Sequence, residues 1–257
     1  MDTFLFDETI FGPIYSRRLG NSLGINLLPC NRKICSFDCV YCECGWTLNE
    51  VEQKGMPERR MVKNLLEKKL IDLINTHNIP DSLTFAGNGE PTLHPNFNEI
   101  IDDTINLRNH YFPKAKISVL SNATQINKPE ILSALLKIEN RILKLDAGSN
   151  EMFQRINHPS SAITLQDIIT GLLSFKGNVT IQTLFLRGNI SGLPIDNTTE
   201  KEINLWLEHL KIINPERVMI YPIARNTPLD NIEIISKEEL DQIGRKVQSL
   251  GIETEIY

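Results

Sequence analysis

The sequence predicts an α/β protein whose parallel sheet forms a partial (β/α)6 barrel of the TIM type. Short apolar runs alternate with helical periodicity along nearly all of the 257 residues. Strands that are separated by single helices pair in parallel through right-handed crossovers. About six such units and a final strand can be recognised, fewer than the eight of a complete barrel.

Each predicted strand is a short, mainly apolar run that ends in small or polar residues. In chain order the strands are 22–28, 82–87, 116–122, 141–148, 178–188, 217–223 and 252–257. The carboxyl ends of parallel strands meet at one rim, and folds of this class place their chemistry there. Functional residues are therefore expected directly after the strands.

Each predicted helix carries apolar residues three or four positions apart. In chain order the helices are 57–77, 96–111, 128–138, 149–157, 164–175, 200–213 and 239–250. Pro129 suits the first turn of the third helix. Thr199 with Glu202, and Ser236 with Glu239, form capping-box patterns at the start of the last two.

Nothing in the sequence divides the chain, so we expect a single domain over residues 1–257. A flat doubly wound sheet is the alternative architecture, but no G-x-G-x-x-G turn follows the first strand to support a dinucleotide site. The amino terminus lacks the features of a signal peptide, and no apolar run approaches the roughly 20 residues of a membrane span. A cytoplasmic protein without a membrane partner is expected, and its oligomeric state stays open.

The formal net charge of −5 argues against a dominating positive field that would attract nucleic acid non-specifically. A local basic face is still compatible with that charge, and its candidates are Arg17 and Arg18, Arg32 and Lys33, and Arg59 and Arg60 with Lys63, Lys68 and Lys69. Solvated surface charge is the alternative, and it suits the lysines of the predicted helix best. Arg17 and Arg18 fit that alternative less well, because the segment around them is glycine-rich and otherwise uncharged.

All five cysteines lie in one short loop after the first strand. In a reducing compartment such clustering indicates metal ligands or catalytic thiols rather than disulfides. Cys35, Cys39 and Cys42 are close enough to wrap one soft-metal centre, such as zinc, copper(I) or an iron–sulfur cluster. A zinc site would need a fourth ligand, which Cys30 or Cys44 could supply. A four-iron cluster on three cysteines would leave one iron open to a substrate or cofactor.

The loop 30–44 resembles the signature of the radical S-adenosylmethionine (SAM) enzymes, because Cys35, Cys39 and Cys42 form C-x3-C-x2-C with the aromatic Tyr41 before the last cysteine. The resemblance implies that the three cysteines hold a [4Fe-4S] cluster whose open iron binds SAM. It also implies reductive cleavage of SAM to a 5′-deoxyadenosyl radical that abstracts hydrogen from a substrate. Tyr41 would then lie against the adenine, with simple loop packing as the alternative.

A second segment, after the second predicted strand, resembles the glycine-rich G-G-E-P element of the same family. It consists of Gly87, Asn88, Gly89, Glu90 and Pro91. Asn88 stands where the family usually has a glycine. The resemblance implies that this segment binds the amino group of SAM, a cation that needs only hydrogen-bond acceptors.

Polar residues at the ends of the remaining strands complete the predicted SAM site. They are Ser121 and Asn122, Asp146, Gln182, and Tyr221 with Pro222. Ser121 and Asn122 are expected to face the methionine carboxylate or the ribose, and Asp146 to accept from ribose hydroxyls. Tyr221 and Pro222 would border the adenine. These roles follow from strand position, and turn chemistry is the alternative for each residue.

The segments 11–29, "LDAG", "RINHP" and "YPIAR" resemble, more narrowly, the radical SAM group related to the wyosine-base synthases of tRNA. Those synthases use a second cluster on upstream cysteines, and no cysteine precedes Cys30 here. The substrate therefore stays open between a tRNA base, a peptide or protein, and a small molecule, with an electron donor of the flavodoxin or ferredoxin type as partner. The alternatives are an activase of a glycyl-radical enzyme and a non-catalytic iron–sulfur or zinc protein.

Overall fold

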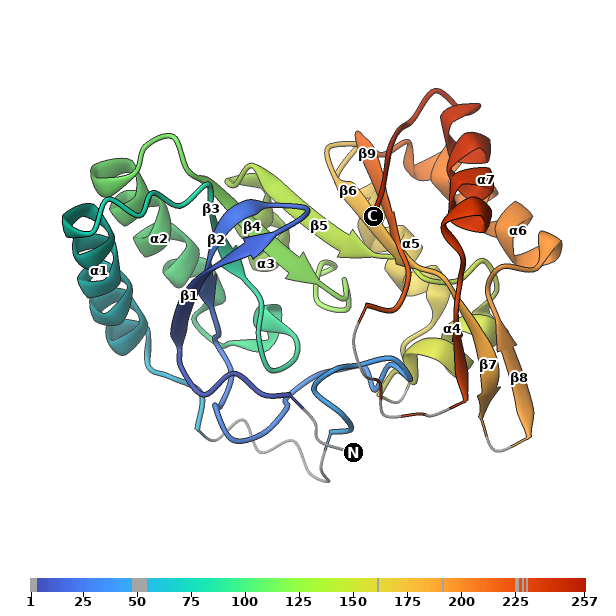
Figure 1. Cartoon of the computed structure of the whole chain (residues 1–257), viewed down its shortest axis with the longest axis horizontal. Coiled ribbons are helices and arrows are strands. Elements are labelled where there is room, and N and C mark those ends of the chain that lie inside the picture. The colour runs from blue at the N-terminus through green and yellow to red at the C-terminus, as the bar shows by residue number, and fades with distance from the viewer. Residues whose placement is uncertain are drawn as a thin grey trace.

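A curved sheet of eight strands is the main feature of the protein, in a computed structural model that describes residues 4–47, 55–160, 162–190, 192–224, 227, 229 and 231–257 (Figure 1). The strand order is β1-β2-β3-β4-β5-β6-β9-β11. The bounds are β1 Ile10–Ser16, β2 Gly20–Ile25, β3 Ser82–Phe85, β4 Lys116–Ser121, β5 Asn140–Lys144, β6 Thr180–Leu184, β9 Arg217–Tyr221 and β11 Glu253–Ile256.

In this sheet β2, β3, β4, β5, β6, β9 and β11 are parallel to one another, and only β1 is antiparallel, at the edge beside β2. Their order in space follows their order in the chain, whereas a doubly wound sheet would reverse direction at a switch point. Within the described residues β1 and β11 do not pair, so the barrel is open. The predicted partial barrel is confirmed.

Helices cover the outer side of the sheet, with α1 and α2 at one end and α6 and α7 at the other (Figure 1). The bounds are α1 Arg59–Asn75, the 3-10 helix η1 Pro91–Leu93, α2 Phe97–Tyr111, α3 Pro129–Leu136, α4 Asn150–Asn157, α5 Leu165–Leu173, α6 Glu200–Ile213 and α7 Lys237–Gln248. Thr199 and Ser236 accept hydrogen bonds from the backbone N–H groups of Glu202 and Glu239, as the capping patterns predict. Within the described ranges, none of these helices is long and apolar enough to cross a bilayer.

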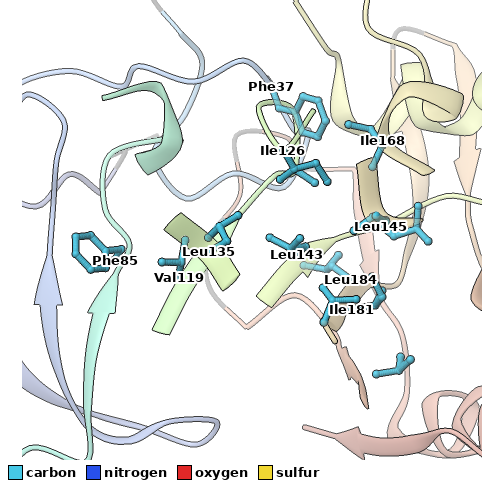
Figure 2. Packing of buried hydrophobic residues seen from close by; sticks show 14 of the residues in the cluster. Phe37, Phe85, Val119, Ile126, Leu135, Leu143, Leu145, Ile168, Ile181 and Leu184 are labelled. Atoms are coloured by element: carbon cyan, nitrogen blue, oxygen red, sulfur yellow. The ribbon is translucent and has the colours of Figure 1, made fainter. Parts of the chain in front are cut away.

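The core lies between the sheet and these helices. Phe85, Val119, Leu143 and Ile181, which come from four neighbouring strands, are completely buried, and Figure 2 shows them in a row across the sheet. Strands buried on both faces read as nearly continuous apolar runs, which is why they are recognisable in the sequence. The cysteine loop is fixed to this core by Phe37, which is also buried.

The predicted strand 178–188 is wrong in its extent, because the chain changes sheets after Leu184. Residues from Leu186 belong to β7 Leu186–Ile190 in a separate sheet with β8 Leu193–Asp196 and β10 Ile232–Ile234. The buried side chain of Asn197 makes the break, since it donates to the carbonyl of Leu184 at 2.8 Å and accepts from the N–H of Leu186 at 2.8 Å. No glycine or proline marks this break in the run itself.

The strand β1 was not predicted, because its sequence IFGPIYS contains the pair Gly-Pro. Proline cannot donate to a strand ladder and is tolerated mainly at sheet edges, which is where β1 lies. The pairing of β1 with β2 is irregular between Phe11 and Ile14, on either side of the proline. The turn after β1 carries Arg17 and Arg18 to the open side of the barrel.

Candidate functional site

A cavity of about 520 Å³ lies on the inner side of the curved sheet. Every one of the strands β2, β3, β4, β5, β6 and β9 contributes at least one residue to its wall. The predicted site residues that line it are Tyr41, Cys42, Gly87, Gly89, Gln182, Tyr221 and Pro222. Arg18 and Lys144 also line it. The cavity therefore joins the cysteine loop to the interior of the barrel.

A larger cavity of about 740 Å³ lies elsewhere. Its wall contains Ser82, Lys116, Asn140 and Arg217, which are the first residues of β3, β4, β5 and β9. It is thus at the amino ends of the strands, whereas parallel α/β folds carry their sites at the carboxyl ends. We take the smaller cavity as the candidate site for this reason.

The cysteine loop is held between the end of α4 and the segment 87–91. The backbone N–H of Val40 donates to the carbonyl of Ile156 at 3.0 Å, and that of Asp38 to the carbonyl of Asn157 at 3.1 Å. On the other side, the N–H of Ile34 donates to the carbonyl of Asn88 at 3.0 Å. The last carbonyls of α4 would otherwise lack partners, so the helix end and the loop fix one another.

Two of the predicted ligand thiols receive side-chain amide hydrogen bonds. Nδ2 of Asn122 lies 3.5 Å from Sγ of Cys35, and Nδ2 of Asn157 lies 3.4 Å from Sγ of Cys39. Burial raises the pKa of Cys35 to about 12 and also raises that of Cys39 above its usual value. A hydrogen bond from Cys44 is the main cause that holds the pKa of Cys42 below its usual value.

The prediction that Lys33 contributes to a basic face is wrong, and Lys33 is not a solvated surface charge either, because only 5% of it is exposed. Its Nζ donates to Oδ1 of Asp38 at 2.8 Å and to the carbonyl of Gly45 at 2.9 Å. Burial alone would lower its pKa, but the neighbouring Cys42, Cys35 and Asp38 raise it above the ordinary value. A buried ammonium group therefore lies beside the thiols.

The donor set fits an anionic iron–sulfur group. Among the described residues, no three His, Cys, Asp or Glu side chains converge closely enough to hold a single metal ion. The thiols nevertheless offer soft ligands, the amides of Asn122 and Asn157 point at sulfur, and Lys33 and Lys144 act electrostatically on the thiols. Amide donors and buried cations both stabilise negative charge on sulfur.

The two glycines of the segment 87–91 are required by its packing. A Cβ on Gly87 would lie 2.3 Å from Oδ1 of Asn26, and a Cβ on Gly89 would lie 1.9 Å from the carbonyl oxygen of Ile34. Gly89 also has φ +129, which L side chains rarely adopt. Gly87 thus lets this segment lie against Asn26, and Gly89 lets it lie against Ile34, the residue before Cys35.

Gly89→Ala is expected to destabilise the protein by about 2 kcal/mol or more and to lower its iron content after reconstitution, because the new methyl group displaces the cysteine loop at Ile34. Gly192→Ala is the matched control, since Gly192 also has positive φ, +88, but has no atom within 4 Å of the added Cβ. Urea unfolding of both variants measures the difference. Equal losses of stability would show that backbone strain, and not the contact with Ile34, is what matters.

Asn88 is completely buried and serves the amino-terminal segment. Its Oδ1 accepts from the N–H of Phe6 at 2.8 Å, and its Nδ2 donates to the carbonyl of Phe6 at 2.8 Å and to that of Pro29 at 2.9 Å. The side chain therefore acts like one residue of a strand ladder. These contacts give a structural reason for an asparagine where the family usually has a glycine.

Glu90 connects the segment 87–91 to the residues after β4. Its Oε1 accepts from the N–H of Thr92 at 3.0 Å and from the hydroxyl of Ser121 at 2.8 Å, and its Oε2 accepts from the N–H of Asn122 at 2.6 Å. The hydroxyl of Thr92 also donates to it. Burial raises the pKa of Glu90 above its usual value, while these hydrogen bonds act in the opposite direction. Glu90, Pro91, Ser121 and Asn122 are all buried outside the cavity wall.

Asp146 lies at the centre of a buried network behind the cavity wall. Its Oδ1 accepts from the N–H of Leu184 at 3.0 Å, and its Oδ2 accepts from Nδ2 of Asn157 at 2.8 Å and from the hydroxyl of Tyr41. Nζ of Lys144 lies 3.5 Å from the same Oδ2 and donates to the hydroxyl of Tyr41. Both carboxylate oxygens of Asp146 thus have protein partners.

Gln182 is the centre of a smaller network that spans the barrel. Its Oε1 accepts from a guanidinium nitrogen of Arg18 at 2.7 Å, and its Nε2 donates to the hydroxyl of Tyr221 at 2.6 Å. The guanidinium of Arg18 also lies over the ring of Tyr221, 5.0 Å from its centre. Two other arginines, Arg155 and Arg187, form ion pairs with Glu151 and Glu239.

Sequence reasoning missed Lys33, Lys144 and Asn157 as parts of this site. Lys144 had a visible signal, since it is a charged residue between the apolar Leu143 and Leu145 of a predicted buried strand. Asn157 had none beyond its place at the end of a helix. Its role depends on the approach of the cysteine loop, which local pattern does not predict.

Comparison with known proteins places these observations in a family. The sequence profile of the radical SAM superfamily matches residues 33–189. A protein of Methanocaldococcus jannaschii called UPF0026 is 33% identical over 85% of this chain and 63% of its own length. The UPF0026 protein of Synechocystis is 33% identical over 86% of this chain and 77% of its own length. A Brachyspira hyodysenteriae protein named GTPase Obg is 29% identical over 91% of this chain, but this chain spans only 33% of it.

Solved structures share the fold at low sequence identity. A radical SAM methyltransferase from Sphaerobacter thermophilus superposes with a TM-score of 0.64 at 11% identity, over 92% of this chain and 65% of that one. SuiB from Streptococcus suis bound to S-adenosylmethionine gives 0.63 at 14% identity, over 92% of this chain and 52% of that one. An archaeal TYW1 gives 0.55 at 14% identity, over 89% of this chain and 71% of that one.

Proposed function

Because the chain belongs to the radical SAM superfamily, we propose that Cys35, Cys39 and Cys42 hold a [4Fe-4S] cluster and that SAM binds in the adjacent cavity. When bound, the cluster supplies an electron that cleaves SAM to methionine and a 5′-deoxyadenosyl radical, which abstracts hydrogen from a substrate. The observation that carries the proposal is that the cysteine loop packs on the segment 87–91 and that both segments line the same cavity. An alternative use of the thiols as a structural zinc site leaves that cavity unexplained.

In this proposal, different residues of the cavity wall and of the layer behind it bind different parts of SAM or fix the wall. Gly87 and Gly89 form the part of the wall nearest the cysteine loop, so their backbone lies where the amino group of SAM would bind. Tyr221 and Pro222 line the wall at the end of β9, where an adenine ring would fit against them. Glu90 acts from behind the wall by fixing the backbone of Asn122.

The substrate and partners belong to the proposal as well. The open edge between β1 and β11 favours a substrate that enters from the side, such as a tRNA base or a protein segment, and a small molecule is the further possibility. An electron donor of the flavodoxin or ferredoxin type would reduce the cluster. We place this chemistry in the cytoplasm, where free thiols stay reduced. This chain spans 33% and 63% of the first two relatives, so the whole proteins' activities are not transferred to it.

The substrate class can be tested by the rate of 5′-deoxyadenosine formation. Reduced, reconstituted protein is incubated anaerobically with SAM and, in turn, with bulk tRNA, a peptide mixture and a metabolite extract. The fraction that contains the substrate is expected to accelerate product formation, because a bound C–H group traps the radical. Stimulation by a glycyl-radical enzyme alone would assign the chain as an activase instead.

A further inference from the structure

Lys144, Asp146 and Asn157 form a chain of contacts that connects the cavity wall to the sulfur of Cys39. Lys144 lines the cavity, and its Nζ lies 3.5 Å from Oδ2 of Asp146. The same oxygen accepts from Nδ2 of Asn157 at 2.8 Å. Nδ2 of Asn157 is in turn 3.4 Å from Sγ of Cys39. An amide nitrogen has two hydrogens, so both contacts of Asn157 can form at once.

The position of Asn157 is fixed by the backbone rather than by these contacts alone. The carbonyl of Asn157 accepts from the N–H of Asp38, and the carbonyl of Ile156 accepts from the N–H of Val40, on either side of Cys39. His158, in the left-handed region at φ 40, ends the helix directly after Asn157. Asn157 is 1% exposed, so its amide cannot turn to solvent. The "RINHP" segment, which the proposed cofactor contacts leave without a role, thus builds this link.

Tyr41 closes the network from the cysteine loop itself. It lies between Cys39 and Cys42 in the sequence, and its hydroxyl contacts both Oδ2 of Asp146 and Nζ of Lys144. The ammonium group also lies 4.8 Å from the centre of the Tyr41 ring. The side chain of Asp146 is 0% exposed and that of Lys144 is 15% exposed. Charges in such a site are weakly screened and act strongly on their neighbours.

We propose that Asp146, paired with Lys144, is a positioning residue that holds the amide of Asn157 on the sulfur of Cys39, and that this hydrogen bond and the charge of Lys144 together set the reduction potential of the cluster. The proposal rests on the proposed function, because it requires a cluster on Cys35, Cys39 and Cys42. Hydrogen bonds to cluster sulfur and nearby charge are the protein's means of tuning such potentials. A cation and an amide donor both favour the more negative, reduced state.

The test is a double-mutant cycle on the midpoint potential of the reconstituted protein, measured by electron paramagnetic resonance during anaerobic dithionite titration. Lys144→Met alone is expected to shift the midpoint potential to a more negative value. At a fixed solution potential the ratio of reduced to oxidised cluster is expected to fall about tenfold, which corresponds to about 59 mV for one electron. In an Asn157→Leu background the same substitution is expected to shift the midpoint potential much less. Asn157→Ala, which removes the amide without adding bulk, provides a second background in case Asn157→Leu does not fold.

Asn122→Leu is the matched control, because the Asn122 side chain donates to Cys35 while its other side-chain contacts are with Ser36 and Thr124, and none is with Asp146 or Lys144 among the described residues. The shift caused by Lys144→Met is expected to keep its full size in that background. Equal shifts in all the backgrounds would overturn the proposal, since Lys144 would then act only through its own charge and not through the amide of Asn157. A wild-type protein that assembles no iron–sulfur cluster would instead refute the proposed function.

Discussion

Replacement of Cys35, Cys39 or Cys42 by Ala is expected to abolish iron and sulfide binding in anaerobically reconstituted protein, from about four irons per chain to nearly none. Each thiolate would be one of only three protein ligands, and a cluster held by two is not retained. Each thiol has its own polar neighbour, which is Asn122 at Cys35, Asn157 at Cys39 and Cys44 at Cys42. Iron and sulfide analysis, together with the visible absorption of the cluster, measures the result.

Cys30→Ala and Cys44→Ala are the controls for this prediction. Both are expected to keep the full iron content, because the three other cysteines and SAM satisfy the cluster. Cys44 contacts Cys42 and the carbonyl of Gly87, so its loss should change the surroundings of the cluster without removing a ligand. Loss of iron in either control, or stoichiometric zinc in place of iron in the wild type, would show that the ligand set is different.

Glu90→Ala is expected to retain the cluster but to weaken SAM binding at least tenfold. It is also expected to lower the melting temperature of the protein. The carboxylate accepts from the N–H groups of Thr92 and Asn122 and from the hydroxyl of Ser121, so its loss leaves buried donors without partners. Each such donor costs about 1–3 kcal/mol. For a chain of this size each kcal/mol lowers the melting temperature by roughly 2–4 °C. Equilibrium dialysis of SAM and thermal unfolding separate the two effects.

Glu202→Ala is the matched control for Glu90→Ala. Glu202 is also a buried carboxylate, and it accepts from the backbone N–H groups of Gly148 and Ser149 at 3.0 Å each, outside the cavity wall. It is expected to lower the melting temperature while SAM affinity is retained. If both variants lost SAM affinity equally, the effect of Glu90 would be a consequence of stability and not of its place behind the SAM cavity.

The elements that depend on short-range sequence patterns, such as apolar runs and helix caps, could be predicted from the sequence. The buried strands β3, β4 and β5 read as apolar runs, and the starts of α6 and α7 follow from Thr199 and Ser236. The edge strand β1 and the break between β6 and β7 were not predictable. The first tolerates a proline only because it lies at an edge, and the second depends on Asn197, which comes from a later part of the chain.

The same distinction holds for the site. The motifs located the cysteines and the segment 87–91, and the radical SAM resemblance is confirmed. The roles of the individual residues in binding a cluster and SAM stay predictions. The sequence could not reveal which polar side chains form hydrogen bonds within the protein, as Asn88 does with Phe6 and Asp146 does with Asn157. Such pairings join segments that are far apart in the chain, so no local pattern predicts them.

The measurement that tests the account most directly is the identity of the nucleoside formed from SAM by the reduced protein. Anaerobically reconstituted protein is reduced with dithionite, incubated with SAM, and its products are separated by liquid chromatography and mass spectrometry. The account predicts slow formation of 5′-deoxyadenosine and methionine in equal amounts, which depends on the cluster and stops in air. Protein that carries the cluster and binds SAM but yields only methylthioadenosine or S-adenosylhomocysteine would contradict it.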